Sequence, residues 1–187
     1  MKKTIFFIIG TFLIANSFTS CKKDSNTASD TGTNHPAKTG QKTTQVENSH
    51  LKTGDLTWMT FEQAAKTKNK GSKKYLVDVY TEWCGWCKVM DKKTFTDPIV
   101  QAYLKENFNI VKFDAEQKES ITFKGKKYDW IPTGRNGVNM LAMELLGSRL
   151  SYPTLVFLDE NMNKIKSSPG YKKPEQLMNE LRVVSGS

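Results

Sequence analysis

Residues 55–187 of this sequence predict an α/β fold, in which helices cover both faces of a mixed β-sheet. Apolar runs typical of buried strands alternate with amphipathic helical patterns along this segment. A Cys-x-x-Cys pair follows the first of these strands, at a strand-to-helix junction. Further strand-like runs and amphipathic helical patterns complete the segment, which is long enough to bury a core.

The first half of this segment contains two clear helix starts. Thr60 and Gln63 have the spacing of a capping box and predict a short helix that continues into Ala64 and Ala65. Asp97, followed by Pro98, predicts the N-cap and first residue of another helix. The other elements predicted here are a strand at 75–80, a helix continuing through 88–90 after the cysteines, a helix at 99–105 and a strand at 109–113.

The second half predicts a hairpin, two strands and two helices. Residues 121–128 predict a hairpin that turns near Gly125. An apolar pattern at i, i+3, i+4, i+7 and i+8 predicts a helix that ends at Gly147. That pattern consists of Val138, Leu141, Ala142, Leu145 and Leu146. Strands are predicted at 154–158 and around 164–166, and a last helix from Pro174 carries Leu177, Leu181 and Val184 on one side.

The N-terminus predicts export from the cytoplasm. Lys2 and Lys3 precede a short apolar run at residues 5–15, which is the pattern of a secretory signal peptide at 1–20. The sequence Ser17-Phe18-Thr19-Ser20-Cys21 resembles a bacterial lipobox, although Phe18 replaces the usual aliphatic residue. The resemblance implies that Cys21 is lipidated and anchors the protein to a membrane, with a periplasmic or cell-envelope location. The alternative is ordinary cleavage nearby, which leaves Cys21 as a free thiol.

Residues 21–54 predict a flexible tether between this anchor and the domain at 55–187. The segment is rich in Thr, Ser, Asn, Gly and Lys, and it has too little apolar surface to offset the entropy lost on ordering. Both histidines of the chain, His35 and His50, lie in it.

The net charge of +9 does not predict nucleic-acid binding. Within residues 55–187, 21 basic residues face 16 acidic ones, and the lysines are interleaved with acids rather than gathered in a stripe with aromatics. A solvated, mildly basic surface is therefore the prediction.

Cys84 and Cys87 are the candidate chemical centre. At the start of a helix, unpaired N–H groups and the helix dipole favour a thiolate at Cys84, which can attack a disulfide, while Cys87 resolves the mixed disulfide. A zinc site within one chain would need further ligands, and the domain contains no other cysteine and no histidine. A dimer that shares two Cys-x-x-Cys pairs is the remaining metal alternative. A purely structural disulfide is the other alternative, but a ring this small removes little entropy from the unfolded chain. No metal and no cofactor other than the redox-active disulfide is predicted.

The residues around the cysteines resemble the active-site signature of the thioredoxin family. The signature is the run 77–88, VDVYTEWCGWCK, and the following KKTFTDPIV at 92–100 resembles the C-terminal periplasmic domain of the disulfide reductase DsbD and its relatives. Ser151-Tyr152-Pro153-Thr154 resembles the family's cis-proline loop. The resemblance covers about residues 55–187 and implies a thioredoxin-like fold with an insertion, at about 115–150, before that loop.

The resemblance also assigns roles to two buried-type charged residues. Asp78 matches the family's acid beneath the disulfide, where burial raises a carboxyl pKa and allows proton exchange with Cys87. Lys112 matches the lysine near that acid. The alternatives are an ordinary strand-end Asp78 and a solvated edge lysine at position 112.

Substrate contacts are implied around the same pair. Pro153 would be cis and would leave the backbone of Tyr152 free to pair with an extended substrate, while Trp83, Gly85 and Trp86 would border the cysteines. Trp83 could equally be packing, whereas Trp86 is expected to be exposed. Because Trp86 stands where thioredoxins usually have proline, their reduction potentials do not transfer to this chain.

The leading hypothesis is an extracytoplasmic reductase of protein disulfides that receives electrons from a membrane partner. The alternatives are a disulfide oxidase or isomerase, and a redox-inert binding lipoprotein with the same fold.

Overall fold

The structure is a computed structural model, which describes residues 52–66, 73–134 and 136–186. The predicted signal peptide at 1–20, the lipidation site Cys21 and residues 22–51 of the tether lie outside the described residues. Strand β1 (Lys52–Thr53) pairs antiparallel with β2 (Leu56–Thr57), so the described fold begins slightly before the expected boundary at Asp55. In the part of the chain that the structure describes, no helix is long and apolar enough to span a membrane.

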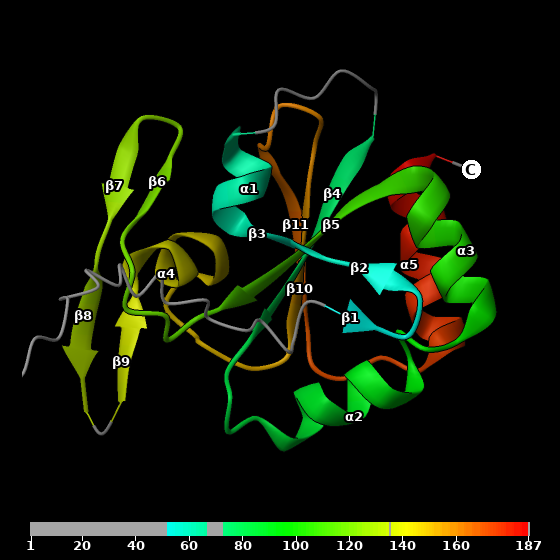
Figure 1. Cartoon of the computed structure of the whole chain (residues 1–187), viewed down its shortest axis with the longest axis horizontal. Helices are drawn as coiled ribbons and strands as arrows, with labels where there is room; N and C mark the ends of the chain where they lie inside the picture. Colours follow the sequence, from blue (N-terminus) through cyan, green and yellow to red (C-terminus); the bar gives the residue numbers. More distant parts are fainter. Residues whose placement is uncertain (1–51, 67–72, 135, 187) are drawn as a thin grey trace, which may run out of the picture. The chain divides into compact units, whose positions relative to one another are not determined.

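A five-stranded mixed sheet forms the centre of the fold, in the order β11-β10-β4-β5-β3 (Figure 1). Strands β3, β4 and β5 run parallel, whereas β10 is antiparallel to both β4 and β11. The strands are β3 (Met59–Thr60), β4 (Lys74–Tyr80), β5 (Phe108–Asp114), β10 (Thr154–Leu158) and β11 (Lys164–Pro169). The predicted α/β class with a mixed sheet is confirmed. Strand β3 was not predicted, because two residues are too few to show a period.

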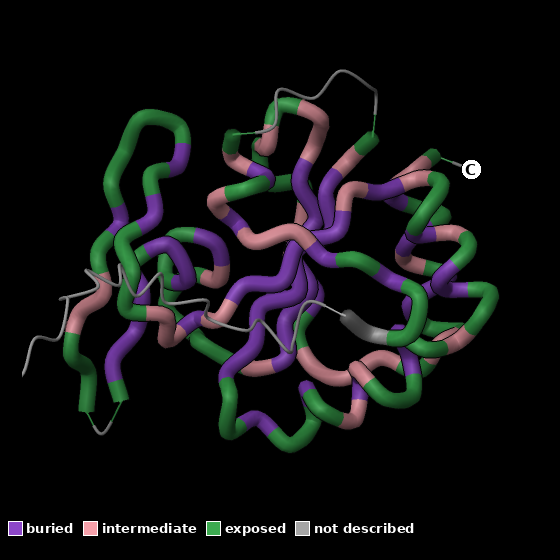
Figure 2. The backbone as a smooth tube through the Cα atoms, in the orientation of Figure 1, coloured by how far each residue is buried: buried purple, intermediate pink, exposed green. Residues whose placement is uncertain are grey.

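Helices cover both faces of this sheet. Helices α1 and α4 pack on one face, and α3 and α5 pack on the other (Figure 1). The helices are α1 (Phe61–Lys66), α2 (Gly85–Lys93), α3 (Pro98–Asn107), α4 (Met140–Leu146) and α5 (Pro174–Ser185). Along β4, Val77 and Val79 join one core while Leu76 joins the other, so buried residues concentrate in the central strands (Figure 2). A strand buried on both faces reads as the continuous apolar run seen in the sequence.

Both predicted helix starts are confirmed. The Thr60 N–H donates to Gln63 Oε1 at 2.9 Å, and the Gln63 N–H donates to Thr60 Oγ1 at 3.2 Å. Asp97 Oδ1 accepts hydrogen bonds from the Ile99 and Val100 N–H groups at 2.9 and 3.1 Å. These contacts satisfy N–H groups that have no partner within the first turn of a helix.

Besides the β1–β2 pair, two hairpins lie outside the five-stranded sheet. Strands β6 (Ile121–Phe123) and β7 (Lys126–Tyr128) form the predicted hairpin, with Gly125 at φ +77° in its turn. Strands β8 (Trp130–Thr133) and β9 (Asn136–Asn139) form a second hairpin that was not predicted.

The assignment of Val138 to a helix was wrong. It lies in β9, and Asn139 starts α4 because its side chain accepts a hydrogen bond from the Leu141 N–H at 3.0 Å. Val138 faces the same core as α4, at 3% exposure, so the apolar pattern continued across the strand–helix boundary.

The last helix offers a matched test of core packing. Val184 is 7% exposed in the core on α5, whereas the adjacent Val183 is 77% exposed. We expect Val184→Ala to lower the free energy of unfolding by about 2 kcal/mol, from lost burial and the cavity left behind. Val183→Ala should change it by less than about 0.5 kcal/mol. Urea denaturation measures both, and equal effects would contradict this packing of α5.

Candidate active site

Cys84 and Cys87 form a disulfide at the point where β4 leads into α2. Cys84 is the N-cap of α2, and Cys87 lies in its first turn. The N–H of Cys87 donates to Cys84 Sγ at 3.1 Å. The predicted strand-to-helix junction is confirmed, and this N–H is placed to stabilise negative charge on Cys84 when the pair is reduced.

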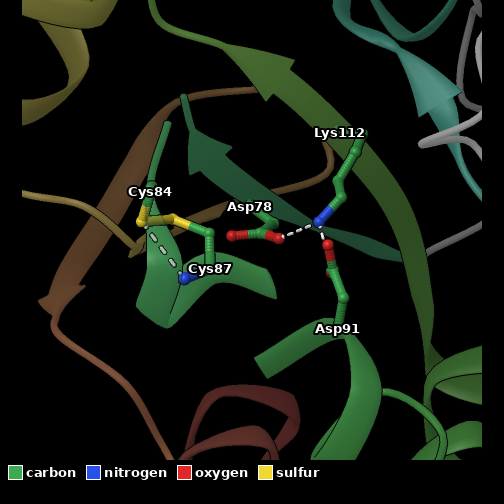
Figure 3. A network of polar contacts seen from close by, with 5 residues as sticks. All are labelled: Asp78, Cys84, Cys87, Asp91 and Lys112. Carbon is green, nitrogen blue, oxygen red and sulfur yellow. Dashed lines mark hydrogen bonds and ion pairs between the residues drawn. A yellow bond between two sulfur atoms is a disulfide. The ribbon is translucent and has the colours of Figure 1, made fainter. Parts of the chain in front are cut away.

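A buried charge cluster lies beneath the disulfide. Lys112 Nζ donates to Asp78 Oδ2 at 2.5 Å and to Asp91 Oδ1 at 2.5 Å (Figure 3). Asp78 is fully buried on β4, and Lys112 stands opposite it on the parallel neighbour β5. Asp91 comes from α2, four residues after Cys87, so the cluster joins the sheet to the helix that carries the cysteines.

Lys112 is not a solvated edge lysine, which corrects that alternative. Its side chain is 2% exposed, because β5 lies inside the sheet between β4 and β3. Its Nζ also lies 5.0 to 5.6 Å from the ring centres of Tyr80, Trp58 and Phe95, at distances typical of cation–π contacts. Two carboxylates and three aromatic faces therefore replace the water that a charged lysine would otherwise keep.

Burial and the neighbouring charges raise the pKa values of both Asp78 and Lys112. Burial raises the pKa of Asp78 above its ordinary value, and the attraction of Lys112 offsets only part of this rise. Burial alone would lower the pKa of Lys112, but the charges of Asp78 and Asp91 outweigh that effect and raise it. The lysine stays charged, while Asp78 holds a proton more readily than an exposed aspartate.

One oxygen of Asp78 remains available for proton exchange. Among the described residues, none donates a hydrogen bond to Asp78 Oδ1, although this atom is buried. Figure 3 shows the carboxyl between the disulfide and Lys112, with one oxygen towards the lysine and the other on the side of Cys87. An unpaired buried oxygen is costly in a core. Its position fits an atom that gains a proton during a reaction cycle.

Two aromatic pairs border the disulfide. Trp83 lies edge-on to Tyr152 with ring centres 6.0 Å apart, and Trp86 lies 5.5 Å from Tyr171. Trp83 and Trp86 are 60% and 63% exposed, so the expected exposure of Trp86 is confirmed and Trp83 is not core packing. Such exposed aromatic faces beside a reactive pair are typical of a contact surface for a partner.

The backbone around the pair has the expected form. The Tyr152–Pro153 peptide bond is cis, as predicted, and Tyr152 packs against the cysteines. Gly85 opens α2 at the surface, with nothing near the position that a Cβ would occupy. The structure therefore brings together every predicted site residue within its described range.

No group of three or more His, Cys, Asp or Glu side chains is arranged to hold a metal ion in residues 52–66, 73–134 and 136–186. The absence of a metal or other cofactor stays a prediction.

Comparison with known proteins agrees with this geometry. The Thioredoxin-like domain family matches residues 61–185, which is more than half of the chain. The chain belongs to the thioredoxin-like family. Its Cys-x-x-Cys pair places it among the thiol–disulfide oxidoreductases of this fold.

Two relatives and one solved structure illustrate the similarity. The thiol:disulfide interchange protein DsbD of Haemophilus ducreyi is 30% identical over 124 residues, and that of Tatumella citrea is 29% identical over 111 residues. These matches cover 66% and 58% of this chain but only 18% and 16% of the relatives. The chain thus spans less than a fifth of their length. The solved structure of a DsbH oxidoreductase matches with a TM-score of 0.51 at 13% identity, covering 76% of this chain and 92% of that one, which supports the fold.

Asp91, Glu116 and Tyr171 were missed by the sequence reasoning. Asp91 is four residues after Cys87, so helical spacing could have placed it on the same side of α2. Glu116 follows β5, and its Oε1 accepts a hydrogen bond from Trp83 Nε1 at 2.8 Å. No short-range pattern signals that contact or the Trp86–Tyr171 pair, because each joins distant segments.

The raised pKa of Asp78 predicts a pH-dependent stability. The pKa of Asp78 in the folded protein lies above the ordinary 3.8, so the folded state binds this proton more tightly than the unfolded state. The resulting gain in the free energy of unfolding is fully present below about pH 3.8 and is lost as the pH rises through the pKa of Asp78 in the folded protein. The Asp78→Asn variant has an uncharged amide at this position, which does not titrate. We expect the variant to gain stability over wild type as the pH rises, by at most about 1.4 kcal/mol per pH unit.

Urea denaturation of the oxidised protein between about pH 4 and pH 9 measures this difference. Asp129→Asn is the control, because the exposed Asp129 has a lowered pKa owing to its contacts with Lys127 and Ser120. Its difference from wild type should change only below about pH 4. A flat or falling difference for Asp78→Asn would contradict the assigned direction.

Proposed function

We propose that this chain is an extracytoplasmic, lipid-anchored thiol–disulfide oxidoreductase that reduces protein disulfides. The single observation that carries the proposal is the Cys84–Cys87 disulfide between an exposed aromatic surface and the buried Asp78. The surface provides contact with a polypeptide, and the buried acid provides proton exchange. The relatives called thiol:disulfide interchange proteins support the same chemistry.

In the first step, the reduced protein forms a mixed disulfide. The Cys84 thiolate attacks one sulfur of the substrate disulfide, the substrate S–S bond breaks, and the other substrate sulfur leaves as a thiolate that takes a proton. Two features favour the thiolate form of Cys84: the Cys87 N–H at 3.1 Å and the N-terminus of α2.

In the second step, Cys87 releases the product. Its thiol gives a proton to the unpaired oxygen of Asp78, and the resulting thiolate attacks Cys84 Sγ. The mixed disulfide breaks, the second substrate sulfur leaves as a thiolate that takes up the proton held by Asp78, and the Cys84–Cys87 disulfide re-forms. Two electrons have moved from the protein to the substrate, so a donor must reduce Cys84–Cys87 again. We propose a membrane-bound thiol donor for that step.

Insulin reduction with dithiothreitol tests the chemistry. We expect wild type to accelerate insulin precipitation, Cys84→Ser to abolish the acceleration, and Cys87→Ser to accumulate a mixed disulfide with insulin. Cys21→Ser is the matched cysteine control and should retain full activity, since the proposal gives Cys21 no part in exchange. An inactive wild type, or an active Cys84→Ser, would reject the proposed activity.

The reduction potential of Cys84–Cys87 decides the direction of electron flow. About 30 mV corresponds to about 1.4 kcal/mol for this two-electron couple. Equilibration with glutathione or dithiothreitol buffers measures it. A potential near about −120 mV, typical of a strong oxidant, would reject a reductase and favour the disulfide oxidase.

Mass spectrometry of the mature protein tests the anchor. We expect an N-terminal Cys21 that carries a diacylglyceryl group and an acyl chain, in protein extracted from membranes. Each buried methylene adds about 0.8 kcal/mol to membrane affinity, so this anchor should resist high salt. Cys21→Ser should leave the unprocessed precursor, and an unmodified mature N-terminus in the wild type would refute lipidation.

A further inference from the structure

The β8–β9 hairpin reaches the cysteine site through one carboxylate. Glu116 Oε1 accepts a hydrogen bond from Trp83 Nε1 at 2.8 Å and another from Asn136 Nδ2 at 3.2 Å. Trp83 directly precedes Cys84, whereas Asn136 begins β9. The indole that borders the reactive pair is therefore held by the same oxygen as the hairpin.

An open hollow of about 350 Å³ lies on the hairpin side of this carboxylate. Its wall combines aromatic, amine and amide groups. Its lining includes Glu116, Lys118, Trp130, Pro132, Asn136 and Gly137. Glu116 belongs both to this wall and to the support of Trp83, so the hollow continues the contact surface around the cysteines.

Trp130 is placed by a close approach to Gly137. These residues lie on neighbouring strands of the hairpin, and a Cβ at Gly137 would overlap the Trp130 ring. The ring remains only half-buried, with Lys118 Nζ 5.8 Å from its centre. Lys118, Pro132 and Asn136 are exposed. A glycine that makes room for a tryptophan thus gives the hollow an aromatic wall instead of adding to the main core.

We propose that the β8–β9 hairpin is a recognition arm that receives an extended polypeptide segment next to the substrate's disulfide. The inference rests on the proposed function and deepens it. An aromatic ring supplies contact area, and exposed amide and amine groups supply hydrogen bonds to a peptide backbone. A small disulfide without a polypeptide would engage the cysteines and leave the hollow empty. The arm therefore selects polypeptide substrates through binding, without taking part in exchange.

The test compares two disulfides in steady-state kinetics of the full chain: insulin, and the small molecule hydroxyethyl disulfide. We expect Trp130→Ala and Lys118→Ala to raise KM for insulin by about fivefold, which corresponds to about 1 kcal/mol. Their kcat for insulin, and their rates with hydroxyethyl disulfide, should equal those of wild type. Lys118→Ala keeps the test decisive if Trp130→Ala disturbs the hairpin, because Lys118 is exposed.

Lys126→Ala is the matched control. Lys126 is also an exposed lysine over an aromatic ring, 4.6 Å from the centre of Tyr128, but it lies on the β6–β7 hairpin. It should leave KM for insulin unchanged. Unchanged KM in Lys118→Ala, equal effects in Lys118→Ala and Lys126→Ala, or parallel losses with both disulfides would overturn the recognition arm. A wild type that reduces neither disulfide would instead reject the proposed function.

Discussion

The position of the Lys112 ammonium group constrains the whole site. A buried charge is costly unless carboxylates and hydrogen bonds replace its water, and Lys112 meets Asp78 and Asp91 at 2.5 Å each. The parallel register of β4 and β5 places Asp78 opposite Lys112, and α2 supplies Asp91. If α2 moved off the sheet, the lysine would lose one of its two counter-charges. The lysine thereby ties the helix that carries Cys84 and Cys87 to the sheet.

The same sharing adjusts the proton affinity of Asp78. Burial is the largest influence on the pKa of Asp78 and raises it, the attraction of Lys112 lowers it, and the negative charge of Asp91 raises it further. The three aromatic rings around Lys112 exclude water without offering a further negative charge. The cluster that links α2 to the sheet therefore also leaves a buried, unpaired oxygen of Asp78 on the side of Cys87.

Most of the sheet and the chemistry of the site could be predicted from local sequence. The apolar runs at β4 and β5, the two capped helix starts and the Cys-x-x-Cys pair are each signalled within a few residues. The pairing of Lys112 with Asp91 could not be predicted, because it depends on how α2 packs against β5. Strand β3 is too short to show a period, and Val138 fitted a helical pattern because strand and helix face one core. Contacts between segments that are distant in the sequence can be identified only when the three-dimensional fold is known.

Strand β5 connects the buried Asp78–Lys112 pair with the proposed recognition arm. Lys112 lies within it, and the turn that follows is fixed by the Ala115 N–H donating to the Tyr80 carbonyl at 2.9 Å and the Glu116 N–H donating to Asp114 Oδ1 at 3.0 Å. This turn aims the Glu116 side chain at Trp83 and Asn136. The hairpin meets the end of β5 through the Asn139 N–H, which donates to the Ala115 carbonyl at 2.7 Å, and through the hydrogen bond from Asn136 to Glu116. In the proposed function, disulfide exchange depends on the cysteine pair and the buried charges, and the choice of substrate depends on the β8–β9 hairpin.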